Sequence, residues 1–169
     1  MKKIRRLQIQ ALMTVLVLCP CFAWAKITVT EKIFHLGTKG LPEWAEFSGK
    51  TPHGRNLAIS FESKANGKEA TLFLHQDDVK QGWRVSLNGK RLGNLERFES
   101  KVLHSLKVPV GTLKDGQNKL AIEAPTAVDD ILVGGAFVEL DPVDEVLSHS
   151  FLEVSAFDKK TSAPLPCRF

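Results

Sequence analysis

The sequence predicts an all-β protein, built as a β-sandwich or barrel. Three observations support this fold class. Apolar residues alternate with small or polar residues in several short segments, these segments recur at roughly 8–12-residue spacing, and turn-forming residues separate them. We find no helical period of useful length and no internal repeat.

The first predicted strands lie in the middle of the chain. Residues 57–62 and 83–87 alternate, and residues 71–74 form a more continuous apolar run. Asn88-Gly89 directly follows residues 83–87, and it is a strong signal for a tight hairpin because both turn residues need a positive φ. Residues 90–95 are therefore expected to be the returning strand.

Further strands are predicted at residues 106–108, 119–123 and 131–140. Residues 109–111 and 114–118 lie between the first two of these and have the composition of turns. Gly134 and Gly135 interrupt the last strand, which suggests a bulge or a close approach of another backbone.

Residues 1–25 are typical of a secretory signal peptide. Four basic residues and no acidic one come before an apolar run at residues 11–18, and Ala23-Trp24-Ala25 has the small-x-small pattern of a cleavage site. An uncleaved membrane anchor is the alternative. We expect a bacterial protein that is exported to the periplasm or the extracellular space, with no membrane association after cleavage.

Cleavage changes both the charge and the cysteine count. The chain has 23 Lys and Arg against 19 Asp and Glu, and removal of the four basic residues of the signal leaves a formally neutral protein. The composition therefore gives no indication of nucleic-acid binding. Cys19 and Cys21 leave with the signal, so Cys167 has no partner for an intrachain disulfide.

A domain boundary is predicted near Asp141-Pro142. Residues 26–142 are expected to form the β-sandwich, and residues 143–169 an incomplete β segment. In that segment residues 152–158 alternate like a new strand, and the polar loop 159–163 follows. An isolated hairpin is marginally stable in water, so the segment either docks on the sandwich or opens a further domain.

Two stretches resemble a known family. Residues 77–90, 108–120 and 129–134 look like a galactose-binding-domain-like jelly roll, in particular the one at the N-terminus of exported CehA/McbA-type metallohydrolases. Residues 154–169 look like the opening of the carboxypeptidase-regulatory-like domain that follows it in those proteins. The resemblance implies an antiparallel jelly-roll sandwich with a short C-terminal β-hairpin. It carries over no catalytic residue, because the family's metal-binding catalytic domain has no counterpart here.

His75, Asp77 and Asp78 form the densest group of candidate ligand-binding residues. One imidazole and two carboxylates at the end of a strand could hold a cation or a sugar hydroxyl, and the alternative is a loop with solvated acids and a structural histidine. Asp129 and Asp130 could supply oxygen atoms to calcium, and turn formation is the alternative. No spacing of histidines or cysteines indicates a transition-metal site, so we expect no cofactor apart from the structural calcium ion that Asp129 and Asp130 could hold.

Two further residues complete the candidate site. Trp44 lies in a loop-like segment, where its indole could stack on a sugar ring or plug an end of the sandwich. Lys80 is the last residue of the candidate ligand-binding loop that begins at Asp77. Trp83 is expected in the core, because it is in phase with Val85 and Leu87.

The function that the sequence favours is that of an exported non-catalytic module which binds carbohydrate or acts as an accessory domain. The alternative is the N-terminal part of a CehA/McbA-type hydrolase whose catalytic domain is missing from this chain. The partners expected are accordingly a carbohydrate or a neighbouring catalytic domain.

Overall fold

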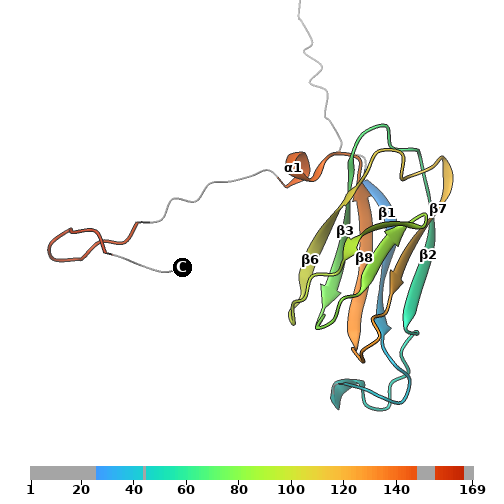
Figure 1. The fold of residues 1–169 in the computed structure, drawn as a ribbon. Coiled ribbons are helices and arrows are strands. Elements are labelled where there is room, and N and C mark those ends of the chain that lie inside the picture. Colours follow the sequence, from blue (N-terminus) through green and yellow to red (C-terminus); the bar gives the residue numbers. More distant parts are fainter. Residues whose placement is uncertain (1–25, 44, 148–154, 166–169) are drawn as a thin grey trace, which may run out of the picture.

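Two antiparallel sheets of four strands each pack face to face (Figure 1). The computed structural model describes residues 26–43, 45–147 and 155–165. The strands are β1 (Lys26–Leu36), β2 (Asn56–Ser63), β3 (Ala70–Asp77), β4 (Arg84–Leu87), β5 (Lys90–Asn94), β6 (Val102–Val108), β7 (Gly116–Glu123) and β8 (Ile131–Glu139). The first sheet has the order β1-β8-β3-β6 and the second the order β2-β7-β4-β5. The prediction of an all-β sandwich is confirmed.

The topology is that of one long hairpin rolled over on itself. The chain pairs β4 with β5, β3 with β6, β2 with β7 and β1 with β8, always antiparallel. Asn88 and Gly89 form the tip, with φ angles of 51° and 79°, as the predicted hairpin requires. Pairing of β3 with β8 and of β4 with β7 then joins the nested hairpins into two sheets. This arrangement is a jelly roll.

The core lies between the sheets and follows the two-residue alternation. Leu57 and Phe61 on β2 are buried, whereas Ala58 and Ser60 between them face outward. Trp83, as predicted, is buried, with 1% of its surface exposed. Each such side chain stabilises the fold by about 1.5–3 kcal/mol through removal of apolar surface from water.

Strand β1 was not predicted, and its register explains why. Its pairing with β8 shifts between Thr28 and Thr30 and again between Thr30 and Ile33. Each shift moves later side chains out of phase, so the alternation of apolar residues is broken in the sequence.

The paired glycines of β8 form the close approach that the sequence predicts. Gly134 has a φ of 150°, and a Cβ atom there would lie 2.0 Å from the carbonyl oxygen of Lys32 on β1. Gly135 has a φ of 51°, and the pairing of β3 with β8 shifts between Phe73 and His75 at this point. The glycines thus allow a bulge in the middle of the first sheet.

The two ends of the sandwich differ. The loop of residues 37–55, which contains the short 3-10 helix η1 (Ala45–Phe47), extends from one end, and α1 (Val143–Val146) lies at the other, against β3 and β6 (Figure 1). Phe157 and Pro164 form an antiparallel bridge, which accounts for the predicted C-terminal hairpin. The predicted signal peptide and Cys167 lie outside the described residues, and the domain boundary near Asp141 stays a prediction.

None of the helices in the described ranges has the length and the apolar character needed to cross a membrane.

Candidate functional site

The structure places the predicted site residues in two separate regions. His75 and Asp77 lie on β3, and the strand's alternation turns both toward the outer face of the first sheet, because Leu74 and Gln76 are buried. Asp78 follows with a φ of 55°, an unusual value for a residue other than glycine, and its side chain is buried beside Lys80. The chain therefore changes direction between Asp77 and Asp78, and the two carboxylates do not share a site.

The outer face of the first sheet carries two adjacent rows of side chains. In one row His75 lies opposite Leu103 on β6 and Gly134 on β8, and Gly134 lies opposite Ile33 on β1. In the next row Asp77 lies opposite Leu132 on β8. Gly134 thus leaves a position without a side chain between His75 and Ile33.

A hollow of about 320 Å³ lies among the side chains of these two rows. Its lining residues are Ile33, His75, Gln76, Asp77, Lys101 and Leu132. A Cβ atom on Gly135 would lie 2.8 Å from Cδ2 of His75 and 3.5 Å from Cδ1 of Ile33, so a side chain there would intrude on the hollow.

The polar groups of the hollow are available to a ligand. Within the described part of the chain, the side chains of His75, Asp77 and Lys101 make no hydrogen bond or ion pair. Gln76 differs, because its amide bonds both the N–H and the C=O of Glu96 and faces the interior. A ligand would thus meet one carboxylate, one ammonium and one imidazole beside the apolar side chains of Ile33 and Leu132.

Asp78, Lys80, Asp129 and Asp130 gather instead at the end of the sandwich next to the loop 37–55. Asp129, only 3% exposed, anchors this group. Its Oδ2 atom accepts hydrogen bonds from Trp83 Nε1 at 2.8 Å, Gln81 N at 2.9 Å and Lys80 N at 3.2 Å. Burial raises the pKa of Asp129, and these hydrogen bonds oppose the rise without cancelling it.

Asp130 connects the same end to the loop. Its Oδ2 atom accepts from the backbone N–H of Glu43 at 2.6 Å, and its own N–H donates to Oε2 of Glu43 at 3.2 Å. Its Oδ1 atom lies 3.2 Å from Nε2 of His35, which stacks on Phe47 with ring centroids 4.1 Å apart. Gly37 is necessary here, because a Cβ atom at that position would lie 1.6 Å from Oδ1 of Asp130.

Lys80 closes the network between two carboxylates. Its Nζ atom lies 2.8 Å from Oδ2 of Asp78 and 3.1 Å from Oε1 of Glu43. Burial would lower the pKa of Lys80, but the two carboxylates outweigh it and the net pKa is raised. Burial raises the pKa of Asp78 despite the ammonium of Lys80. Burial would also raise the pKa of Glu43, yet the Asp130 N–H and Lys80 lower it on balance.

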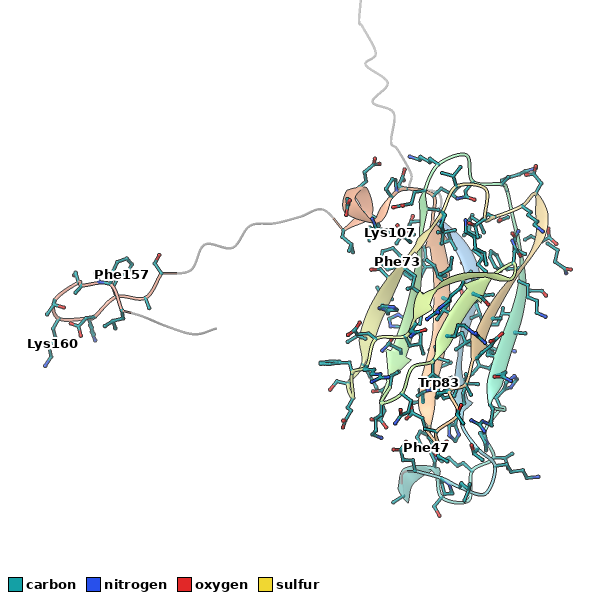
Figure 2. The ribbon with its side chains drawn as sticks, in the orientation of Figure 1. Phe47, Phe73, Trp83, Lys107, Phe157 and Lys160 are labelled. Carbon is teal, nitrogen blue, oxygen red and sulfur yellow. The ribbon has the colours of Figure 1, made fainter. Side chains whose placement is uncertain are left out.

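This end network, made of His35, Glu43, Asp78, Lys80, Asp129 and Asp130, is largely saturated by its own partners. It joins the loop 37–55 to the segment that precedes Trp83, to Trp83 itself and to the segment that precedes β8. Figure 2 shows Phe47 in that loop, beyond the end of the sandwich near which Trp83 lies. Oδ1 of Asp129 is buried with no hydrogen-bond partner among the described residues. The arrangement holds the loop in place.

Sequence reasoning missed two of the six residues of the end network and four of the six residues that line the hollow. The network residues are Glu43 and His35, and the lining residues are Ile33, Gln76, Lys101 and Leu132. These residues come from segments far apart in the chain, and no local motif marks them. Trp44, the predicted stacking residue, lies outside the described residues.

The predicted calcium ligands remain untested. Both carboxylate oxygens of Asp130 and one of Asp129 lie within hydrogen-bonding distance of protein nitrogens. Across the ranges that the structure describes, no group of three or more His, Cys, Asp or Glu residues is arranged to hold a metal ion.

Comparisons with known proteins add one likeness. No family model and no curated protein matches the chain. Among solved structures, the chain is similar to a family 35 carbohydrate-binding module from an environmental isolate, at 16% identity over 66% of this chain and 97% of that chain, with a TM-score of 0.34. Neither that identity nor that TM-score carries information about function.

Proposed function

We propose that this chain is a non-catalytic module that binds carbohydrate in the hollow on the outer face of the first sheet. The observation that carries the proposal is the contrast between the two regions. The polar groups of the end network bond one another, whereas His75, Asp77 and Lys101 surround a cavity with their bonding capacity unused. Concave sites that combine apolar surface with a few convergent polar groups are typical ligand sites.

The chemistry of the hollow suits a sugar. The carboxylate of Asp77 accepts hydrogen bonds from hydroxyl groups, the ammonium of Lys101 donates to them, and the imidazole of His75 does either, depending on its tautomer. Ile33 and Leu132 offer aliphatic surface to the C–H groups of a pyranose ring. The hollow therefore offers contacts both to the hydroxyl groups and to the C–H groups of a sugar.

The outer face of the second sheet is a weaker candidate. A shallow groove of about 440 Å³ runs there over Ala58 and Ala121. Among the described residues that line it, Glu123 is the one carboxylate and is already paired with Arg84, and Lys119 is the other charged residue. It lacks the convergence of unpaired polar groups that the hollow has.

A binding role is favoured over catalysis by the number of acidic groups. Hydrolysis of a glycosidic bond ordinarily needs two carboxyl groups on opposite sides of the bond. Asp77 is the one carboxylate among the described residues that line the hollow. We therefore assign no catalytic residue.

A glycan array probed with the mature chain, followed by affinity electrophoresis in polysaccharide gels, tests the proposal. We expect retention on at least one glycan, and an Asp77→Ala variant should weaken it about tenfold or more, because sugar hydroxyls lose a charged acceptor. Asp115→Ala is the matched control, since Asp115 is an exposed carboxylate outside the hollow. Absence of retention on every glycan, or equal loss in both variants, would refute the proposal.

Export is part of the same proposal and has its own test. The predicted cleavage site places Lys26 at the mature N-terminus, where β1 also begins. N-terminal sequencing of the chain recovered from the periplasm or medium should give Lys26 first, and an intact Met1 would contradict export by cleavage.

A second candidate function is that of an accessory piece of a larger hydrolase. The bridge between Phe157 and Pro164 closes a short hairpin on which Phe157 is 60% and Leu165 47% exposed. Such a hairpin gains stability when its apolar side chains pack on further β structure. An in-frame continuation after Phe169 with histidine-rich metal motifs would support this role, and a stop codon there would argue against it.

A further inference from the structure

We propose that the sugar bound in the hollow is a neutral hexose that carries a methyl group on one edge, as a 6-deoxyhexose does. This inference rests on the proposed function and narrows it to a class of sugar. It follows from how the polar and apolar side chains divide the hollow between them.

The two halves of the hollow differ in chemistry because they come from different strands. The strand order β1-β8-β3-β6 places Ile33 of β1 and Leu132 of β8 on one side. It places His75 and Asp77 of β3, with Lys101 immediately before β6, on the other. A ligand that fills the hollow must therefore present hydroxyl groups to one side and hydrocarbon to the opposite side.

The apolar half would penalise an ordinary hexose. Ile33 and Leu132, which form this half, have no hydrogen-bonding atoms in their side chains. The hydroxymethyl group of an ordinary hexose, placed against this surface, would meet no side chain that can hydrogen-bond to its hydroxyl. A methyl group at the same position would instead bury apolar surface without that loss.

Charge and size narrow the class further. Asp77 and Lys101 carry opposite charges, so the rim is balanced and favours a neutral sugar over a uronate or an amino sugar. A volume of about 320 Å³ lies at the small end of ligand sites, which suits a single sugar residue better than a chain segment.

Matched sugar pairs test the inference. L-fucose differs from L-galactose, and L-rhamnose from L-mannose, by replacement of a hydroxymethyl group with a methyl group. Titration of the mature chain, followed by NMR chemical shifts of backbone amides, should show the deoxy sugar of at least one pair binding about tenfold or more tightly than its parent. The shifted amides should include those of Ile33, His75 and Leu132.

Two substitutions test whether Ile33 is responsible for the preference for the deoxy sugar. Ile33→Thr keeps a β-branched strand residue but introduces a hydroxyl into the apolar half, and it should reduce the ratio of the two affinities toward one. Val110→Thr is the matched control, because Val110 is 60% exposed against 53% for Ile33 and does not line the hollow. It should leave the ratio unchanged.

The outcomes separate the two proposals. A parent hexose that binds as tightly as its deoxy partner in both pairs, with shifts at the hollow, overturns this inference and leaves carbohydrate binding intact. Shifts confined to other parts of the chain overturn the assignment to the hollow. No binding of any sugar, here and on the glycan array, overturns the proposed function and this inference with it.

Discussion

Replacement of Trp83 by phenylalanine isolates the contact that joins the core to the end network. The indole is 1% exposed, and its Nε1–H donates to Oδ2 of Asp129 at 2.8 Å. Phenylalanine removes this donor and part of the ring while leaving the β-sandwich pattern unchanged. Asp129 keeps its bonds from the backbone N–H groups of Gln81 and Lys80, so its carboxylate is not stripped of partners.

The expected loss in the free energy of unfolding has two parts. A hydrogen bond to a charged group contributes about 1.5 kcal/mol or more to stability. The missing ring atoms remove packing worth roughly 1–2 kcal/mol, since the surrounding core can close only part of the gap. The free energy of unfolding should therefore fall by about 3 kcal/mol, a large share of the roughly 5–15 kcal/mol that holds an ordinary domain together.

Urea unfolding followed by circular dichroism measures this change, provided that the m-value stays constant. A double-mutant cycle with Asp129→Asn separates the two parts, because a neutral amide oxygen makes a hydrogen bond about half as strong as a carboxylate does. We expect Trp83→Phe to cost about 1 kcal/mol less in that background. An equal cost in both backgrounds would show that the charge of Asp129 adds nothing to the hydrogen bond with the indole N–H, and would refute this part of the reasoning.

Three further predictions concern the supports of the sandwich. Gly37→Ala places a Cβ atom 1.6 Å from Oδ1 of Asp130, so it should displace that carboxylate. The free energy of unfolding measured in urea should fall by about 2 kcal/mol or more, and a change within ~0.5 kcal/mol would contradict the geometry. The pKa of Glu43 is lowered in the folded protein, so its contribution to stability is present above its ordinary pKa and is lost as the pH falls through the lower folded value. Glu43→Gln should therefore lose less stability than the wild type when the pH falls from about 6 to 3. Parallel profiles of stability against pH in the two proteins would refute this. Asn118 is 1% exposed, and its side chain makes hydrogen bonds with Ser63, Asn88, Lys114 and Gly116. Asn118→Ala should therefore lower the free energy of unfolding by about 2–4 kcal/mol, whereas Asn56→Ala, at an exposed position with one such bond, should lower it by about 1 kcal/mol or less. Similar losses in the two variants would contradict the role of burial.

Local patterns predicted most of the sandwich. Alternation placed β2 and β4, because in each of these strands one face is buried against the facing sheet and the other is turned outward. The Asn88-Gly89 signal gave the tip of the long hairpin, since few other residue pairs adopt its dihedral angles. Strand β1 escaped prediction because two register shifts scramble its alternation. A pattern of period two cannot reveal a strand whose pairing slips.

The candidate site was only partly accessible to the same reasoning. The proximity of His75, Asp77 and Asp78 in sequence suggested one cluster, but the positive φ of Asp78 sends its side chain to the end network while the other two stay on the outer face. Ile33 and Leu132 carried no signal, because an exposed aliphatic residue on a strand has no distinguishing neighbour in the sequence.

The sequence by itself determined the fold class, the hairpin tip, the burial of Trp83 and the close approach at Gly134-Gly135, because each depends on neighbours within a few residues. Only the tertiary structure decided which polar groups are satisfied and which are left to a ligand. That outcome depends on distance in space: Glu43 reaches Asp130 across 87 residues, and the residues that line the hollow come from β1, β3, β8 and the residue that precedes β6.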